Sequence, residues 1–547
     1  MSVRAGHLAG TPLGYRRCVP RVSAVLALAL AACTPAIAPV PTAPTGTAAP
    51  PRLVVLLVID QWPSWAFDAK RAQLHGGGFD RLLSEGEWHT GLHPSAATLT
   101  APGHALFGTG EPTASSGILS NGWWHRDLER HLSAVEAEDG STTTKWLRVP
   151  GLGDAVAAAD TGAKAVSISL KDRAALLMLG HAGTAIWYDP RLVAWRTLTT
   201  PAPAWLDAWN RDHPIEPRLH APWQPLDPAQ LARLSGEPDN VPAEVGEKGF
   251  GPTFPHDPQA THAPAEAVFA MPLGNDLVLE TAVAAIDGEH LGADATPDLL
   301  EISLSAHDYV GHGWGQESWE MWDLEQRLDR SLAQLLAALD TKVGAGRWAM
   351  IVTSDHGGSP LPERMPSGGR ITYAEIATAA NRAASAELGP GEWIAEARYP
   401  SLYLSAAARA LPAHDRDMAL RKIVFALRSF PGIARVERTA DIAGNCAART
   451  GDDFVFCLGL DPERSGEIAY LPAPGWLTQD DDEPFAAAHG SMNDYDRRVP
   501  VIMLAPGRTP HASLAAHDDT TIYMVRIATV LARWLGVTPP TNLPRTP

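Results

Sequence analysis

The stretch RLVVLLVID, residues 52–60, is a run of large apolar side chains that ends at a carboxylate, Asp60. A continuous run of this kind is typical of a strand that is buried on both faces of a parallel sheet. Three later stretches have the same form: AVSISL precedes Lys171, PDLLEISLSA precedes Asp308, and RWAMIVTS precedes Asp355. Together they predict parallel strands at the centre of an α/β fold.

The side chains that follow these four strands are polar or charged. Ligands of open α/β sheets bind outside the carboxyl ends of the strands, so side chains at these ends can converge on one crevice. A single Asp after a strand is commonly only a turn residue or a helix N-cap. Histidines accompany the carboxylates here, in Asp308-x-x-x-His312 and in Asp355-His356-Gly-Gly. This pattern favours a functional site at that edge of the sheet.

Helices are expected between and after the strands, on both faces of a mostly parallel core sheet. Residues 317–341 carry leucines at helical spacing and predict a helix that faces the core. VPVIMLAP, residues 499–506, predicts another buried strand. Asp518-Asp519-Thr520 predicts the cap of an amphipathic helix over residues 521–536.

Two regions interrupt this alternation. Residues 189–275 are rich in Pro and Trp with little strand periodicity, which predicts an insertion over the sheet. Residues 386–488 mix short strands with a basic amphipathic helix and predict a small α+β subdomain. We therefore expect one catalytic domain over residues 52–547 that carries two insertions.

The N-terminus predicts export. Basic residues precede an apolar run at 22–32, which is too short to span a bilayer but fits the apolar region of a signal peptide. The run ends in Leu-Ala-Ala-Cys33 and resembles a bacterial lipoprotein processing site, with cleavage without a lipid as the alternative. We expect a signal peptide over 1–33, a Pro/Ala/Thr-rich tether over 34–51 and a lipid anchor at Cys33 in the periplasm or cell envelope.

Composition narrows the remaining classes of function. The chain has 547 residues and a formal net charge of -18, which argues against a nucleic-acid-binding surface because such surfaces need clustered Lys and Arg. Cys446 and Cys457 are the only cysteines after Cys33. In an oxidising compartment, two cysteines this close in sequence predict a disulfide.

The stretch TLTAPGHALFGTGEPTASSGILSN, residues 98–121, contains the candidate nucleophile, Thr100. Proline two residues later is typical of a first helical turn, so the Thr100 hydroxyl is expected at a helix N-terminus. Backbone N–H groups and the helix dipole make such a place suitable for a phosphate or another anion. The alternative for Thr100 is an ordinary N-cap.

Six further side chains are candidate metal ligands: Asp60, Asp308, His312, Asp355, His356 and His489. Carboxylates mixed with imidazoles suit zinc, whereas a set of oxygen ligands alone would suit magnesium or calcium. Six ligands exceed the need of one tetrahedral ion. They predict two Zn²⁺ ions per chain, about 4 Å apart.

These motifs together resemble the alkaline phosphatase superfamily, and most closely its bacterial periplasmic phosphate monoesterases with a threonine nucleophile. The motifs are VLLVID, TAPGHALFGTG, GILSN, SLKDR, DYVGH, TSDHGG and His489-Gly-Ser-Met. The resemblance extends from Arg52 to Val537 in the family's order. It implies hydrolysis of small phosphate monoesters by an exported enzyme.

The resemblance also implies roles for individual residues. One zinc ion would be held by Asp308, His312 and His489, and the other by Asp60, Asp355, His356 and Thr100. Thr100 would attack phosphorus to form a covalent phosphothreonine, which is then hydrolysed. Asn121, Lys171 and Arg173 would contact the non-bridging oxygens of the substrate. The alternative for residues 171–173 is a solvated turn of alternating charge.

Nucleotide pyrophosphatases and phosphodiesterases of the same superfamily share the metal ligands and the Thr and Asn, and they are the alternative. A sulfatase is excluded on the family pattern, because no Cys occurs between Cys33 and Cys446. A zinc-binding lipoprotein without turnover would need neither Thr100 nor the Lys-x-Arg pair. The sequence assigns no role to His104 or His181, and His307 could compete with Asp308 as a ligand.

Overall fold

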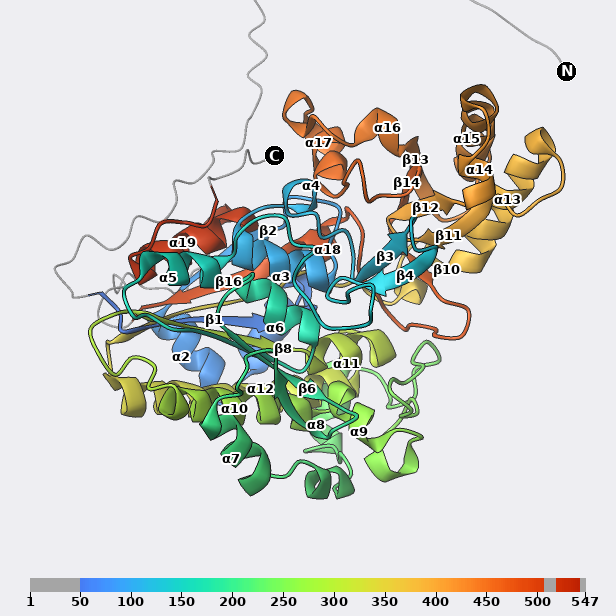
Figure 1. Ribbon diagram of the computed structural model, residues 1–547. Coiled ribbons are helices and arrows are strands. Elements are labelled where there is room, and N and C mark those ends of the chain that lie inside the picture. The colour runs from blue at the N-terminus through green and yellow to red at the C-terminus, as the bar shows by residue number, and fades with distance from the viewer. Residues whose placement is uncertain (1–49, 506–517, 542–547) are drawn as a thin grey trace, which may run out of the picture. The chain divides into compact units, whose positions relative to one another are not determined.

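The computed structural model describes residues 50–505 and 518–541. Within these residues the largest sheet has the strand order β17-β2-β16-β9-β1-β8-β5-β6-β7 (Figure 1). Its strands are β1 (Leu53–Ile59), β2 (Glu87–Leu92), β5 (Ala165–Ser169), β6 (Thr184–Asp189), β7 (Ala194–Thr197), β8 (Asp298–Leu304), β9 (Trp348–Thr353), β16 (Arg498–Leu504) and β17 (Asp518–Tyr523).

The four strands predicted from apolar runs are β1, β5, β8 and β9, and they lie side by side and parallel. Their register aligns their carboxyl ends, because Val58 pairs with Thr353 and Ile59 pairs with Leu304. β16 is antiparallel to both of its neighbours, and β7 is antiparallel to β6. The sheet is therefore mostly parallel, and the predicted α/β class is confirmed.

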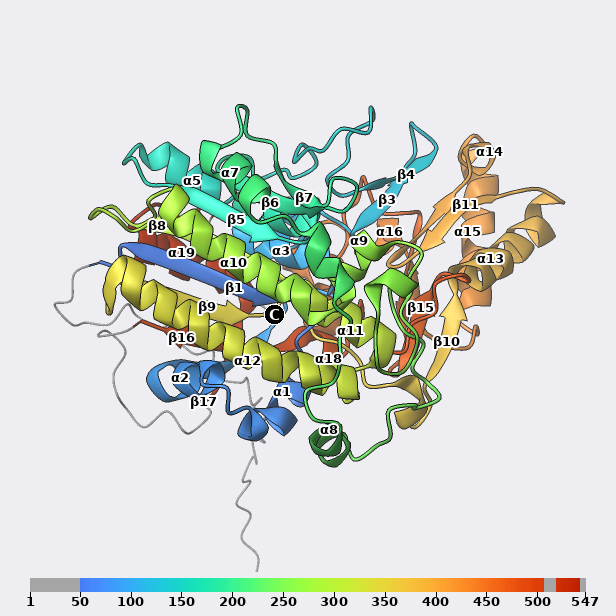
Figure 2. The ribbon, with the colours of Figure 1, turned by 90° about the horizontal axis from the view of Figure 1, so that it is seen from below.

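Helices cover both faces of this sheet. α10 (Pro272–Gly288) and α12 (Trp319–Leu339) run across one face, while α3 (Thr100–Thr109), α6 (Asp172–Leu179) and α19 (Ile527–Leu535) cover the other (Figures 1 and 2). Side chains of β1 alternate between the two faces of the sheet. Leu53, Val55 and Leu57 pack with the leucines of α12. Val54, Leu56 and Val58 pack with the helices of the opposite layer. Burial on both sides explains why the strand reads as a continuous apolar run.

Shorter elements connect these layers. They are α1 (Ser64–Lys70), α2 (Gly78–Glu85), α4 (Thr113–Ser116), α5 (Leu152–Ala159), α11 (Ala306–Trp314), α18 (Asp494–Arg497) and the hairpin β3 (Gly122–His125) with β4 (Arg130–Ser133). The helix predicted over 317–341 is α12, whose N-cap Ser318 accepts a hydrogen bond from the backbone N–H of Met321.

The C-terminal helix begins later than predicted. Residues 518–523 form β17, which pairs with β2, and the helix α19 starts only at Ile527. The reason is tertiary: Thr521, Ile522 and Tyr523 are β-branched or aromatic and lie along the free edge of β2. Edge pairing therefore overrides the helical spacing of this segment.

Residues 189–275 contain the edge strand β7 followed by short helices: α7 (Ala204–Asp212), α8 (Pro228–Ser235), α9 (Pro264–Ala267), and the 3-10 turns at 216–220, 258–260 and 268–270. α7 packs on α10, and α8 packs on α12. This segment thus covers the outer side of the helical layer.

A second sheet, with the order β11-β12-β14-β13, forms a small α+β unit. Its strands are β11 (Ile394–Arg398), β12 (Ser401–Leu404), β13 (Ile433–Arg438) and β14 (Ile468–Pro472), and the parallel pair β10 (Gly369–Thr372) and β15 (Trp476–Gln479) lies beside it. α13 (Tyr373–Leu388) and α15 (Ala413–Leu427) pack together with this sheet around its own apolar core. The short helices α14 (Ala406–Arg409) and α16 (Thr439–Ile442) complete the unit.

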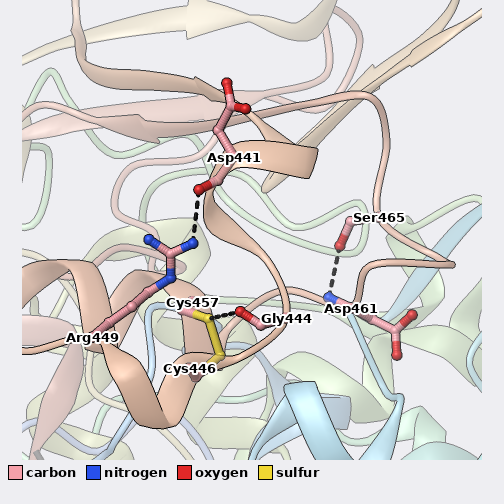
Figure 3. Close-up of a disulfide and its surroundings, with 7 residues drawn as sticks. All are labelled: Asp441, Gly444, Cys446, Arg449, Cys457, Asp461 and Ser465. Atoms are coloured by element: carbon pink, nitrogen blue, oxygen red, sulfur yellow. Dashed lines mark hydrogen bonds between the residues drawn. A yellow bond between two sulfur atoms is a disulfide. The ribbon is translucent and has the colours of Figure 1, made fainter.

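The predicted disulfide is present. Cys446 and Cys457 are bonded, with their Cα atoms 5.6 Å apart, and the bond joins a 3-10 turn at Cys446–Ala448 to α17 (Gly451–Leu458) (Figure 3). Cys457 is fully buried.

Residues 1–49, which include Cys33 and most of the predicted tether, lie outside the described part of the chain. Among the described helices, none is long and apolar enough by itself to cross a membrane, and one bent pair, Pro264–Ala270 with Pro272–Gly288, passes only as a pair.

Candidate functional site

The candidate metal ligands meet at the carboxyl edge of the large sheet. They come from four segments that are far apart in sequence: Asp60 after β1, Asp308 and His312 on α11, Asp355 and His356 after β9, and His489 in the loop between β15 and α18. Because β1, β8 and β9 are in register, the first three of these segments leave the sheet at the same level, and the His489 loop joins them from outside the sheet. The convergence predicted from the strand ends is thus found in the structure.

Asp308, His312 and His489 form the first of two clusters. One ligand atom from each lies within 4.8 Å of the others. Asp308 Oδ1 is 3.3 Å from His312 Nε2 and 3.5 Å from His489 Nε2. The i, i+4 spacing of Asp308 and His312 puts both on one face of α11. This group matches the first ligand set implied by the resemblance.

The second cluster contains Asp60, Asp308 and His356, again with ligand atoms within 4.8 Å. His356 Nε2 lies 3.5 Å from Asp60 Oδ1 and 3.3 Å from Asp355 Oδ2. Asp308 thus belongs to both clusters, whereas the resemblance implied Asp355 in the second. In the structure Asp355 borders that cluster through its contact with His356.

In each of the three imidazole rings, Nδ1 contacts a backbone carbonyl. Nδ1 lies 3.0 Å from the Ala487 carbonyl in His312, 2.9 Å from the Gly357 carbonyl in His356 and 2.8 Å from the Thr98 carbonyl in His489. A carbonyl can only accept, so each ring donates from Nδ1 and presents the lone pair of Nε2 toward the carboxylates. Such backbone contacts are typical of metal-binding histidines, since they fix both tautomer and ring direction.

The charge balance of the clusters also fits divalent cations. Burial, together with the charges of Asp308 and Asp355, raises the pKa of Asp60 well above its usual range. Asp60 Oδ1 and His356 Nε2 are buried and have no hydrogen-bond partner among the described residues. Buried carboxylates and imidazole lone pairs that face one another are stabilised by a bound cation. Carboxylates with imidazoles are the donor set that zinc prefers.

Lys171 lies inside this group of carboxylates. It is the N-cap residue of α6, and its Nζ is 2.7 Å from Asp60 Oδ2 and 2.6 Å from Asp308 Oδ2. Burial lowers the pKa of Lys171, but the two carboxylates outweigh burial and raise it overall. The side chain is 2 % exposed, so the alternative of a solvated turn does not hold for Lys171.

Arg173 lies one residue beyond the start of α6 and is only partly buried. Together with Lys171 and Tyr309 it lines a cavity of about 190 Å³. Its Nε has no hydrogen-bond partner among the described residues. A charged guanidinium and an ammonium therefore face the same small cavity.

Thr100 is the first residue of α3 and is 1 % exposed. The N-cap position belongs to Leu99, so Thr100 is not an N-cap. The Ala101 N–H donates to Asn121 Oδ1 at 2.9 Å. This bond occupies the acceptor end of the Asn121 amide and leaves the NH₂ group as the end that can donate to a substrate oxygen.

The first turn of α3 lies directly against Asp355. A Cβ on Gly103 would be 2.4 Å from the Asp355 carbonyl oxygen, so glycine permits this approach. Thr98, the other hydroxyl of this stretch, donates to the Ser491 carbonyl at 2.9 Å. Thr98 is therefore engaged in holding the His489 loop.

The three histidines without a predicted role have structural contacts. His307 is fully buried, with Nδ1 3.1 Å from the Asp60 carbonyl and Nε2 3.3 Å from Glu325, so it turns away from both clusters. His104 links the Thr100 carbonyl to Ser303 Oγ, each at 2.8 Å. His181 is exposed and contacts Asp154.

Gln61 is a site residue that sequence reasoning missed. Its Nε2 donates to Asp308 Oδ1 at 2.9 Å and lies 3.3 Å from His312 Nε2. Its backbone has φ 58°, which is uncommon for a residue other than glycine and often marks a functional site. The only signal in the sequence is its position next to Asp60, because a backbone angle is not readable from residue type.

The family model described as "Type I phosphodiesterase / nucleotide pyrophosphatase" matches residues 54–494. The chain belongs to this family. The match begins within β1 and ends at the first residue of α18, so it includes every candidate ligand and Thr100. The superfamily predicted from the motifs, that of the alkaline phosphatases, is confirmed.

Within the family, alkaline phosphatases are prominent among the relatives. Alkaline phosphatase PafA of Elizabethkingia meningoseptica is 29% identical over 84% of this chain and 87% of its own. Alkaline phosphatase PhoK of Sphingomonas sp is 31% identical over 84% of this chain and 85% of its own. The crystal structure of PafA matches with a TM-score of 0.79 at 25% identity, over 92% of this chain and 99% of that one. These findings confirm an enzyme of the phosphoric monoester hydrolase class.

Two further structures bear on the site and the fold. A solved PafA variant carries substitutions of a threonine, an asparagine, a lysine and an arginine, in that order along its chain. Thr100, Asn121, Lys171 and Arg173 have the same types and order, with the same separations within the first and the second pair. Murine ectonucleotide pyrophosphatase / phosphodiesterase 5 matches with a TM-score of 0.51 at 12% identity and shows the shared fold alone.

Proposed function

We propose that this family member is an exported, zinc-dependent phosphate monoesterase that acts through a phosphothreonine at Thr100. The observation that carries the proposal is the arrangement of three imidazoles, each with Nε2 turned toward Asp60, Asp308 or Asp355, beside the N-terminus of α3. A merely structural metal site would not need a buried hydroxyl at a helix start next to it.

Two ions would be held by the predicted ligands. Asp308, His312 and His489 would bind one, and Asp60, Asp355, His356 and the Thr100 hydroxyl would bind the other, with Asp308 close enough to serve both. Two zinc ions bound in this way would lower the pKa of the nucleophile and stabilise charge on the leaving oxygen.

Thr100 would attack phosphorus in this mechanism. Its position at the start of α3 directs backbone N–H groups and the positive helix end toward the anionic substrate. The Thr100 oxygen forms a bond to phosphorus while the bond to the leaving alcohol breaks, and water then releases phosphate from the threonine.

Lys171, Arg173 and Asn121 would hold the non-bridging oxygens. Lys171 and Arg173 line one small cavity next to the clusters, and the Asn121 amide has a donor free to point at the substrate. Phosphoryl transfer proceeds mainly by positioning and charge stabilisation, so these three groups supply what a loose transition state requires. Two cations on the terminal oxygens favour a dianionic monoester over a diester.

The second candidate is hydrolysis of diesters, because the matching family model is described by phosphodiesterase and pyrophosphatase activities. The deciding experiment compares kcat/KM for an aryl phosphate monoester with that for the matched diester. A clear preference for the monoester supports the proposal. A preference for the diester moves this chain to the phosphodiesterase function.

A further inference from the structure

A cavity of about 450 Å³ opens beside His312, outside the metal clusters. Its walls are the loop 245–250, residues around 262–266 and the segment 482–485 that precedes the His489 loop. Phe485 forms the inner wall and packs on the His312 ring, with ring centroids 4.4 Å apart. The cavity is thus adjacent to the candidate active site.

A row of four neighbouring rings connects the metal-ligand clusters to this cavity. His356 and His489 are 3.7 Å apart between centroids, His489 and His312 are 5.1 Å apart, and Phe485 follows His312. The row begins next to Asp355, against which the first turn of α3 lies, and ends at the cavity. The cavity thus adjoins Phe485, which packs on His312, whereas it is His489 whose Nδ1 contacts the Thr98 carbonyl. In-line displacement puts the leaving group opposite the nucleophile, and the cavity side of the row is the side to which we assign it.

The outer wall is held closely to the site. The backbone N–H groups of Val245 and Gly246 both donate to the Gly313 carbonyl at 3.0 Å. A Cβ on Gly313 would be 2.8 Å from the Glu247 Cβ, so glycine on α11 lets the loop approach. Lys248 has φ 53°, a left-handed conformation that the surrounding contacts must maintain. The cavity therefore has a defined shape.

Negative charge dominates the lining of this cavity. Four carboxylates line it, those of Glu247, Glu266, Asp482 and Glu483, against one lysine and His262. The lysine, Lys248, is already engaged: its Nζ is 3.4 Å from Glu247 and 4.9 Å from the centroid of the Tyr309 ring. Glu266, Asp482 and Glu483 are exposed and line the cavity, so the carboxylates outnumber its cationic side chains.

The cavity also has aromatic walls. Phe250 and Phe485 line the same cavity, and aromatic faces attract ammonium groups, including quaternary ones. Carboxylates and aromatic rings around one cavity are the usual recognition elements for such cations. A carboxylate or a second phosphate on the leaving group would instead meet like charge.

We infer that this cavity receives the leaving alcohol and selects alcohols that carry an ammonium or trimethylammonium group over those that carry another anion. The inference rests on the proposed monoesterase function, since it assigns the alcohol side of that reaction. The reaction itself is unchanged: water and the ester give the alcohol, which takes up a proton, and inorganic phosphate.

The test uses three esters that differ in charge. Phosphocholine has a cationic leaving group, 3,3-dimethylbutyl phosphate has the same shape without charge, and phosphoglycolate has an anionic one. We expect the cationic ester to be favoured over the neutral one more strongly at low than at high ionic strength, because salt screens exposed charges. Phosphoglycolate should have the lowest kcat/KM.

The variant that tests the wall is Asp482→Asn combined with Glu483→Gln. It should lower the ratio of kcat/KM for phosphocholine to that for 3,3-dimethylbutyl phosphate by about three- to tenfold, the effect expected for two partly screened charges. The charge control is Asp452→Asn with Asp453→Asn, an exposed acidic pair in which Asp453 is ion-paired with Arg435. The pair belongs to α17, which Figure 1 shows well away from α9 and α11. This control removes the same charge and should leave the ratio unchanged.

The outcomes separate this inference from the proposed function. An equal ratio in wild type and in the Asp482, Glu483 variant, or the highest kcat/KM for phosphoglycolate, overturns the inference while aryl monoester hydrolysis continues. Loss of the ratio in the α17 control as well would assign the effect to net charge and also overturn it. If the wild type hydrolyses no aryl monoester, the proposed function itself fails.

Discussion

The imidazole rings of His356 and His489 stack with their centroids 3.7 Å apart and their planes 16° from parallel. Burial lowers the pKa of both rings, and for His489 the neighbouring His356 lowers it further. Both rings are therefore neutral near pH 7, which is the form that binds a metal ion. The stacked pair connects the two clusters and needs no proton loss before metal binding.

The first prediction concerns metal content. Purified protein should contain about two zinc ions per chain, and chelation should abolish turnover. His489→Ala should lose about one of the two ions by elemental analysis, since it removes one ligand of the Asp308 cluster. His181→Ala is the control, because the hydrogen bonds of His181 among the described residues go to Asp154 and Leu147, and its loss should leave the zinc content unchanged. Equal zinc in both variants would contradict the assignment.

The second prediction concerns the nucleophile. Thr100→Ala should lower kcat by about a thousandfold or more, whereas Thr100→Ser should keep a substantial part because the hydroxyl remains. Acid-quenched wild-type enzyme should carry phosphate on Thr100, as detected by peptide mass spectrometry. Phosphate on Thr98 would be the contrary result, although the Thr98 hydroxyl is bonded to Ser491 in the structure.

The third prediction concerns Lys171 and Arg173. Charged contacts to substrate oxygens in a water-poor site contribute roughly 2 to 4 kcal/mol to the transition state, or about a hundredfold or more in rate. The double variant Lys171→Ala, Arg173→Ala should lose monoester hydrolysis steeply and diester hydrolysis far less. The measurement is kcat/KM for matched aryl esters in both proteins. Equal losses on the two substrates would argue for a phosphodiesterase.

The fourth prediction concerns a buried acid with no catalytic task. Glu301 lies in the middle of β8, and neither carboxyl oxygen has a hydrogen-bond partner among the described residues. Burial raises its pKa to about 8 from an ordinary value of 4.5. The unfolded chain releases this proton at a lower pH than the folded chain does. The free energy of unfolding should therefore fall as pH rises from about 4.5 through about 8.

Glu301→Gln tests this directly. It removes the titrating group, and the decline, on the order of a few kcal/mol in the wild type, should be smaller in the variant. Chemical denaturation at pH 5, 7 and 9 with a chelator present measures both slopes, so metal binding does not contribute. Parallel slopes in the two proteins would show that Glu301 does not titrate in this range.

The fifth prediction concerns location, and it rests on Leu30 to Cys33 and the Pro-rich tether, which lie outside the described residues. The protein should fractionate with membranes through a lipid on Cys33. Cys33→Ser should release it. Equal membrane association of the variant would contradict a lipid anchor at this residue.

Much of the central fold could be predicted, because buried strands and helices have characteristic spacings of apolar residues in the sequence. Strands buried on both faces, such as β1, read as unbroken apolar runs, and α12 shows its core face as leucine spacing. Strand order is different, because it depends on pairing between segments far apart. No feature within residues 518–523 indicates that they pair with β2. The spacing of apolar residues therefore predicts a helix cap and the start of a helix where the structure has the strand β17.

For the site as well, positions that follow from local sequence could be predicted, and contacts between distant segments could not. Asp60, Asp308 and Asp355 could be placed together because a strand end in a parallel sheet is a predictable position. The contacts of Gln61 could not, since they follow from a positive φ that its residue type does not indicate. The assignment of Asp308 to both clusters likewise depends on distances of a few ångström that no spacing rule contains.

The place of β16 in the sheet has a consequence for timing. Although it is formed by residues 498–504, β16 lies between β2 and β9, and His489 comes only shortly before it. During synthesis, β2 therefore cannot be joined to β9 through this strand until residues 498–504 have emerged. The segment that supplies β16 also carries His489, so the strand that joins β2 to the rest of the sheet and the ligand that follows the other five in sequence come from one stretch of the chain.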